Sequence, residues 1–337
     1  MKLIIAITMG DPGGIGPEVI LKSLEQIESK KVIPLVIGSS DAFRFASERF
    51  QIPFAPHEVP TLERSLLRED TVNFLDMTRE AEALYEKAFG KKHLKNEMFS
   101  LGEVSEWNGA LAYSALKIAA YQAALGLING IVTAPVNKNA VRLIDPDFSG
   151  HTEYLAKIAR VKDFAMMFIN ERLRVTLVTI HVPLRDAARV LKTEDIITKT
   201  MLTEEFLRRY FKITRPRIGI SALNPHGSEF GTEEEEKIIP AVQKIRVKGI
   251  DVKGPLPGDQ VFHEAYEGRL DAVIAMYHDQ GLAPFKMIAF RDGVNVTLGL
   301  PYLRTSPDHG TAFDIAYQGR AEAISFQSAF QLLERLI

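Results

Sequence analysis

The sequence predicts a doubly wound α/β protein, in which helices cover both faces of largely parallel sheets. Two patterns carry this prediction: short β-branched runs that are apolar at successive positions, and longer stretches of helical spacing between them. A third observation is the size, because 337 residues with 46% hydrophobic residues suit one large or two smaller domains. The expected strands are residues 3–9, 32–37, 128–133, 165–169, 173–180, 217–223, 272–277 and 294–298.

Helical patterns fill much of the sequence between these strands. Residues 109–125 repeat apolar side chains at helical spacing. Residues 232–236 predict a helix start, with Thr232 as N-cap, Glu235 completing a capping box and carboxylates at the positive end of the helix dipole. The stretch 52–96 is more polar and irregular, and we interpret it as an excursion outside the sheet.

The composition excludes several classes of chemistry. The formal net charge of −2 gives no general attraction to nucleic acid or to anionic membranes. Because the chain has no cysteine, it cannot use disulfides, iron–sulfur clusters, thiolate zinc sites or a thiol nucleophile. The apolar run at 3–9 is too short for a signal peptide, and no run reaches 18 apolar residues. We therefore expect a cytoplasmic protein without nucleic-acid or membrane partners.

Three histidines stand where expected strands end. His181 and His278 follow their strands at once, and His226 comes after a short Asn-Pro step. Because the carboxyl ends of parallel strands meet at one edge of a sheet, we expect these three side chains to converge. Imidazoles suit zinc, cobalt or iron, and added oxygen ligands extend the choice to manganese or magnesium. Asp259 is a candidate for a further ligand or for orienting one. The competing interpretation is that each histidine is a hydrogen-bonded structural residue.

Polar loops follow other strands in the same way. The glycine-rich stretch 10–18 joins the first strand to a helix, but its spacing is neither a dinucleotide-binding fingerprint nor a phosphate-binding loop, so a tight turn and a ligand loop remain equal alternatives. Residues 150–153 open a helix whose free N–H groups favour an anion. Lys286, Asn295 and Arg304 are candidate hydrogen-bond donors to a phosphate. The competing interpretation is that each is a solvated surface residue. No nucleophile elbow occurs, which disfavours acyl-transfer hydrolysis.

The motifs, taken in their order along the chain, resemble the 4-hydroxythreonine-4-phosphate dehydrogenase family of pyridoxal phosphate biosynthesis. The resemblance covers nearly the whole chain. The matching strings are GDPGGIGPE at 10–18, APVNK at 134–138, GHTEYLA at 150–156, NPH at 224–226, MYHDQG at 276–281 and DHGTAFDIA at 308–316. The resemblance implies two α/β/α lobes like those of isocitrate and isopropylmalate dehydrogenases, with the active site in the cleft between them. We expect residues 1–133 plus 300–337 in the first domain, and 134–299 in the second, with the metal-site histidines and dimer contacts.

The resemblance also assigns residues. The implied metal ligands are His181, His226 and His278, for one divalent ion per site (zinc, magnesium, cobalt or manganese). The implied substrate contacts are His151, Thr152, Lys286, Asn295 and Arg304. The implied cofactor is NAD, with NADP as the alternative, and by analogy with the related dehydrogenases it lies near Gly10, Asp11, Gly310 and Asp314. The implied assembly is a homodimer with each active site at the subunit interface.

The implied reaction is oxidation of 4-phosphooxy-L-threonine followed by loss of carbon dioxide, with Lys138, Asp279 or a metal-bound hydroxide as base. The string after His226 and Tyr317 after the last motif depart from the family pattern. They leave open a related dehydrogenase of threonate or erythronate 4-phosphate. A non-catalytic phosphometabolite-binding protein and a metal-dependent phosphatase are the alternatives from other classes.

Overall fold

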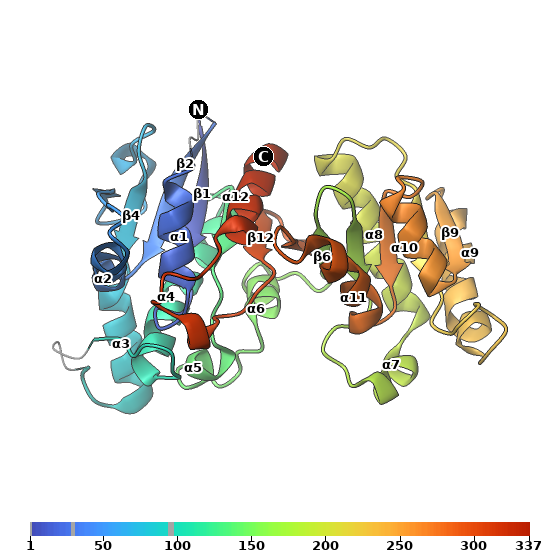
Figure 1. Ribbon diagram of the computed structural model, residues 1–337, viewed down its shortest axis with the longest axis horizontal. Helices are drawn as coiled ribbons and strands as arrows, with labels where there is room; N and C mark the ends of the chain where they lie inside the picture. The colour runs from blue at the N-terminus through green and yellow to red at the C-terminus, as the bar shows by residue number, and fades with distance from the viewer. Residues whose placement is uncertain (1, 28–30, 94–97) are drawn as a thin grey trace. The chain divides into compact units, whose positions relative to one another are not determined.

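The computed structural model describes residues 2–27, 31–93 and 98–337, which form two compact α/β units (Figure 1). The first unit comprises Met1–Arg160 and Leu300–Arg335, with Ile337. The second comprises Val161–Gly299, with Leu336. The mixed α/β class with mostly parallel strands, predicted from the sequence, is confirmed. No helix in the described ranges is long and apolar enough to span a membrane.

The first unit is built on a parallel sheet with the strand order β3-β4-β2-β1-β5-β12. Its strands are β1 (Leu3–Thr8), β2 (Val32–Gly38), β3 (His57–Glu58), β4 (Asn73–Asp76), β5 (Gly130–Thr133) and β12 (Leu303–Pro307). Every residue of β2 is buried, as expected for a strand covered on both faces. β12 brings the C-terminal part of the chain back beside β5.

Helices of the first unit connect these strands and cover the sheet. They are α1 (Gly16–Leu24), α2 (Ser40–Phe50), α3 (Thr78–Phe89), α4 (Glu106–Ala124), α5 (Lys138–Arg142), α6 (His151–Ile158) and α12 (Ile324–Leu336), with short 3-10 turns at Arg64–Leu66 and Phe313–Ile315. α4 is the predicted helix at 109–125. The chain passes to the second unit after Arg160, whereas the sequence places this crossing at residue 133. The stretch between them stays with the first unit, because the Tyr113 hydroxyl of α4 donates to Asp145 at 2.7 Å and its ring contacts Tyr154 of α6.

The interpretation of 52–96 as an excursion outside the sheet is wrong for its described part, 52–93. β4 pairs in parallel with β2, and β3 extends the same sheet as its edge strand. Both strands are short and carry polar residues, which is common at a sheet edge and removes the apolar pattern that marks central strands. Residues 94–96 lie outside the described residues.

Gly109 of α4 lies against the backbone of α5. A Cβ atom on Gly109 would lie 2.0 Å from the Ala140 carbonyl oxygen, far inside van der Waals contact. Gly109→Ala is therefore expected to lower the free energy of unfolding by about 2 kcal/mol or more, because overpacking outweighs the higher helix propensity of alanine. Urea unfolding would measure the loss. Gly310→Ala is the control, since a Cβ there meets no atom within 4 Å, and an equal loss in both variants would contradict the prediction.

The second unit has the strand order β11-β6-β7-β10-β8-β9. Its strands are β6 (Ala165–Ile169), β7 (Arg174–Leu177), β8 (Ile218–Ser221), β9 (Val252–Leu256), β10 (Ala272–Ala275) and β11 (Val294–Leu298). β6 is antiparallel to both of its neighbours, whereas β7, β10, β8 and β9 run parallel. The predicted strands of this unit are all present, and three of them end two or three residues early, where the chain enters the loops that carry the histidines.

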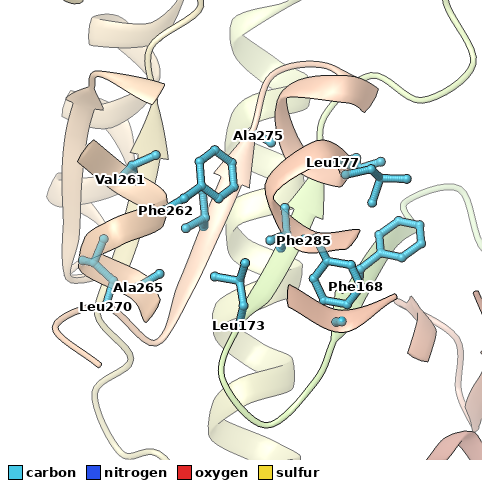
Figure 2. Packing of buried hydrophobic residues seen from close by; sticks show 13 residues of the cluster. Phe168, Leu173, Leu177, Val261, Phe262, Ala265, Leu270, Ala275 and Phe285 are labelled. Carbon is cyan, nitrogen blue, oxygen red and sulfur yellow. The ribbon is translucent and has the colours of Figure 1, made fainter. Parts of the chain in front are cut away.

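Helices pack on both faces of this second sheet. They are α7 (Leu184–Val190), α8 (Thr193–Tyr210), α9 (Ile239–Val247), α10 (Gly258–Tyr266) and α11 (His278–Ala289). Figure 2 shows one apolar cluster, to which α11 contributes Phe285, α10 contributes Val261 and β7 contributes Leu177. A second cluster joins Ile220 and its strand neighbours to Ile196 and other helix residues. Two buried clusters with different helices are the mark of a doubly wound sheet.

The predicted capping box at 232–236 is wrong. The chain there forms a π-helical turn, Glu234–Ile238, and no side-chain hydrogen bond caps it. Glu234 turns inward and is completely buried, and its carboxylate accepts hydrogen bonds from the loop after β8. The acidic run is therefore only partly a solvated helix start, since one of its carboxylates serves a tertiary contact.

Candidate functional site

The histidine loops of the second unit share one edge of its sheet. β10 lies between β7 and β8, and all three run parallel. The carboxyl end of β7 leads to the loop of His181, that of β10 to His278 at the start of α11, and that of β8 to the loop of His226. The strand pairing confirms that these three residues follow parallel strands, and the order β7-β10-β8 adds that the strands are neighbours.

His181 and His278 lie together at this edge. Their ring centroids are 6.0 Å apart, and both side chains reach solvent. Two imidazoles bound to one zinc ion have centroids about 5–6 Å apart, given metal–nitrogen distances of about 2.0–2.1 Å. His278 Nδ1 is 2.7 Å from Asp279 Oδ1. A proton on Nδ1, donated to this carboxylate, leaves Nε2 as the nitrogen available to a metal.

His226 stands on the loop after β8 with a left-handed backbone, φ 57°. Its ring contacts Phe230, with centroids 6.3 Å apart. Across the part of the chain that the structure describes, no three His, Cys, Asp or Glu side chains are grouped closely enough to hold a metal ion. The structure thus brings two of the three predicted ligands together and places the third on the adjacent strand end.

The other predicted residues of the second unit are dispersed. Asp259 is exposed in the first turn of α10, and its Oδ1 accepts from the Gln260 N–H at 3.1 Å. The Lys286 ammonium on α11 lies 6.0 Å from the Phe290 ring centroid. Asn295 lies on β11, and its buried Oδ1 has no hydrogen-bond partner among the described residues. An unsatisfied buried acceptor of this kind can receive a donor from a ligand.

The first unit gathers a cationic cluster around Arg304. The Arg304 side chain is 3% exposed on β12, and both Nε and a terminal nitrogen donate to Thr133 Oγ1, at 3.1 and 2.6 Å. Burial lowers the pKa of Arg304 to about 10, while the nearby Glu153 carboxylate raises it. The guanidinium therefore stays charged at neutral pH. Thr133 is one hydrogen-bond partner of this buried charge, and the planar guanidinium donors are of the kind that suits an anionic ligand.

His151 faces this cluster from the first turn of α6. Burial holds the pKa of His151 well below its usual range, and the positive charges of Arg304 and Lys138 lower it further. The imidazole is therefore neutral at pH 7, and its buried Nε2 has no hydrogen-bond partner within the described ranges. Thr152, the next residue, is also buried. The start of α6 thus presents a neutral ring and the positive end of the helix dipole to the same region as the guanidinium.

Lys138 and the glycine-rich loop lie next to this cluster. A Cβ on Gly150 would meet the Lys138 ammonium at 3.3 Å, so Lys138 reaches the start of α6. Gly10 has φ 75°, and a Cβ there would lie 2.4 Å from the Pro135 carbonyl oxygen. The glycine in this loop is thus required by the protein's own backbone, which favours the tight-turn interpretation. Burial raises the pKa of Asp11 to about 6, although hydrogen bonds led by the Gly13 N–H lower it.

The residues predicted to lie near a dinucleotide fall on two loops that touch. The Ile15 N–H donates to the Thr311 carbonyl at 3.0 Å, which joins the loop of Gly10 and Asp11 to that of Gly310 and Asp314. A Cβ on Gly310 would meet no atom within 4 Å, so a ligand has room to approach its backbone. These loops offer space and a carboxylate for a dinucleotide, and no described contact assigns one to them.

Three residues of these sites are absent from the sequence prediction. Thr133 binds Arg304, Glu234 binds the loop before His226, and Gln280 joins the ends of β8 and β10. Thr133 ends an expected strand, so the rule that selected the histidines would have found it. Gln280 lies inside the MYHDQG string, two residues after His278, whereas Glu234 lies in an acidic run that is typical of a solvated helix start.

The comparisons with known proteins test the resemblance that the sequence motifs indicate. A model of the family described as pyridoxal phosphate biosynthetic protein PdxA matches residues 30–333. The chain belongs to the PdxA family. The resemblance found in the sequence motifs is thereby confirmed.

Relatives of this PdxA-family chain carry two different names. It is 40% identical over 345 residues to D-threonate 4-phosphate dehydrogenase of Pectobacterium atrosepticum, which covers 98% of this chain and 100% of that protein. It is also 40% identical over 333 residues to 4-hydroxythreonine-4-phosphate dehydrogenase of Desulforapulum autotrophicum, covering 98% and 94%. A crystal structure of 4-hydroxythreonine-4-phosphate dehydrogenase from Klebsiella pneumoniae matches with a TM-score of 0.84 and 37% identity, covering 100% and 99%. Relatives of equal sequence identity are thus named for different substrates.

Proposed function

We propose that the chain is an NAD-linked, divalent-metal-dependent dehydrogenase of pyridoxal 5'-phosphate biosynthesis. In this proposal it oxidises 4-phosphooxy-L-threonine to 2-amino-3-oxo-4-phosphooxybutanoate, which loses carbon dioxide to give 3-amino-2-oxopropyl phosphate. The dehydrogenase names of its relatives support an oxidoreductase. The observation that carries the substrate class is the buried guanidinium of Arg304 beside the neutral ring of His151.

The Arg304 cluster is suited to a phosphorylated hydroxy acid. The guanidinium supplies charge and planar donors, and the N–H groups at the start of α6 add uncharged donors. His151, neutral at pH 7, offers a donor or an acceptor to a hydroxyl or carboxyl oxygen without adding charge. Thr152, Lys286 and Asn295 are the further proposed substrate contacts.

His181 and His278, with His226 from the adjacent strand end, would hold the divalent metal. When bound, the metal supplies Lewis-acid polarisation of the substrate hydroxyl and lowers its pKa. The Asp279 carboxylate fixes the orientation of the His278 ring through their 2.7 Å hydrogen bond. One described chain groups no three such ligands, which is compatible with our proposal of a homodimer that completes each site with residues from both subunits. In this proposal Asp259 orients one of the metal ligands.

The proton acceptor has two candidates among the side chains. Asp279 is 86% exposed and hydrogen-bonded to His278, so its carboxylate can accept a proton without a prior deprotonation. Lys138 lies beside Gly150 and His151, where the positive charge of its ammonium also serves an anion. An ammonium must first lose a proton to act as a base. Both candidates are therefore retained, and pH–rate profiles of Asp279→Asn and Lys138→Met would separate them.

A spectrophotometric assay tests the proposal. Incubation with NAD and 4-phosphooxy-L-threonine is expected to produce NADH, and removal of metal with EDTA is expected to abolish it until a divalent ion is returned. Zinc, cobalt, manganese and magnesium would be returned one at a time, and NADP would replace NAD in a parallel series. Phosphate release without NADH formation would identify a phosphatase and overturn the proposal. Binding of substrate without any turnover would identify a binding protein.

The second candidate substrate is D-threonate or erythronate 4-phosphate. The Pectobacterium relative, at 40% identity over its whole length, carries the D-threonate name. In addition, the chain departs from the family pattern at Gly227-Ser228 and at Tyr317. The buried Tyr317 hydroxyl donates to the Pro12 carbonyl at 2.7 Å, so this departure reinforces the glycine-rich loop. Parallel NADH assays with these acids decide the matter, and a higher kcat/KM for threonate phosphate would reverse our order.

A further inference from the structure

A buried carboxylate holds the backbone of the loop that leads to His226. Glu234 Oε1 accepts from the N–H groups of Leu223 and Asn224, each at 2.8 Å, and Oε2 accepts from Asn224 Nδ2 at 2.8 Å. The side chain is completely buried. Hydrogen bonds to a buried charge are stronger than those between neutral groups, and the two backbone N–H groups no longer have a strand partner at this point.

These contacts set the turn on which His226 stands. The Gly227 N–H donates to the Asn224 carbonyl at 3.3 Å, so the turn closes on the residue that Glu234 grips. His226 itself has φ 57°, a conformation that costs a non-glycine residue energy unless its surroundings enforce it. Glu234 enters from a π-helical turn, a distortion that is frequent at functional sites. The direction of the His226 side chain therefore depends on an anchored Asn224.

A second side chain ties this loop to the strand that carries His278. Gln280 Oε1 accepts from the Met276 N–H at 2.7 Å, and Gln280 Nε2 donates to the Ala222 carbonyl at 2.6 Å. Met276 directly follows β10 and Ala222 directly follows β8, so one amide joins the two segments that leave the strand ends. Gln280 and Glu234 thereby hold the same segment at successive residues, Ala222 and Leu223-Asn224.

We propose that Glu234 is a positioning residue of the metal site, which fixes His226 for coordination, with Gln280 setting the spacing between the loops of His226 and His278. This inference rests on the proposed metal site. It predicts that the two side chains matter for metal affinity and ligand geometry beyond any contribution to folding. Loss of hydrogen-bond partners that orient metal ligands typically lowers metal affinity about 10- to 100-fold.

Glu234→Gln tests the role of the carboxylate in the full-length protein. Glutamine keeps the shape of the side chain, but it replaces one acceptor oxygen with an N–H donor that faces the donors of Asn224 or Leu223. The dissociation constants for Zn²⁺ and Co²⁺, measured by calorimetry with the metal alone, are expected to rise about 10-fold or more. The visible spectrum of bound Co²⁺ is expected to change, which a purely structural role would not cause. Glu235→Gln, on an exposed neighbour in the same turn, is the matched control and is expected to bind as the wild type does.

Gln280→Met is a second, independent variant if Glu234→Gln fails to fold. Methionine fills a similar volume without either hydrogen bond, and a comparable loss of metal affinity is expected. If the wild type binds Co²⁺, His226→Ala abolishes that binding, and both Glu234→Gln and Gln280→Met bind with wild-type affinity and spectrum, the inference is overturned while the proposed function stands. If the wild type binds no divalent metal at all, the proposed metal site and this inference fall together.

Discussion

Replacing Arg304 with methionine is expected to lower kcat/KM for a phosphorylated substrate by about 100- to 1,000-fold. The buried guanidinium offers planar, charge-assisted donors, and each such hydrogen bond contributes about 1.5–3 kcal/mol. Losing two hydrogen bonds near the lower end of this contribution costs about 3–4 kcal/mol in total, which gives this range because 1.4 kcal/mol is about a factor of ten. Methionine fills the space without a charge, so the fold is expected to survive, as it does when buried ionic groups are replaced by apolar ones. Steady-state NADH formation measures the effect.

The control for this variant is Arg44→Met, on an exposed face of α2. Arg44 pairs with Asp41 at 3.5 Å, and both side chains are about two-thirds exposed. A second readout is the titration of His151, which NMR can follow. Arg304 lowers the pKa of His151, so its removal is expected to raise that pKa, although burial, the larger cause, still keeps it below the usual range. A loss in kcat/KM of less than about fivefold would place the phosphate elsewhere.

The sequence predicted that His181, His226 and His278 lie at one edge of the sheet, because a single topological rule governs their position. Once β7, β8 and β10 are recognised as parallel strands, the residues after them must lie at the edge formed by the carboxyl ends of these strands. No knowledge of side-chain contacts is needed for this prediction. Strand order is not predictable in this way, yet it decides that His278 stands between the other two. The metal itself remains a prediction.

The sequence did not predict the contacts that hold these loops. β12 contains an arginine and ends in a proline, so it lacks the apolar pattern, and its Arg304 is stabilised by Thr133, which lies 171 residues away. β3 and β4 are hidden for a related reason, since strands of two and four residues are too short to show a clear apolar pattern. Glu234 looks like a solvated helix residue until the loop after β8 folds against it. Each of these cases depends on a tertiary contact that local spacing does not encode.

Asp11→Asn is expected to stabilise the protein at pH 8 and to have little effect on stability near pH 4. Burial raises the pKa of Asp11 from 3.8 to about 6, so ionisation of this carboxyl is more costly in the folded protein than in the unfolded chain. The difference corresponds to about 3 kcal/mol in the free energy of unfolding. Asparagine keeps an oxygen that can accept from the Gly13 N–H, now 2.9 Å from Asp11 Oδ1, without the charge. Urea unfolding at both pH values measures the difference between variant and wild type.

The direction of this pH dependence follows from proton binding by Asp11. Between pH 3.8 and about 6 the folded protein holds the proton and the unfolded chain has released it, so the Asp11 contribution to stability falls as the pH rises. Below this interval both states are protonated, and the advantage of asparagine disappears. Asp41→Asn, which removes an exposed carboxylate from α2, controls for the general effect of net charge. An equal gain at pH 4 and pH 8 would show that burial of the charge is not the cause. The wild type retains a buried charge that lowers its stability, and we expect such a charge to be retained for a role in the reaction. Asp11→Asn is therefore also expected to lower the rate of NADH formation at pH 8.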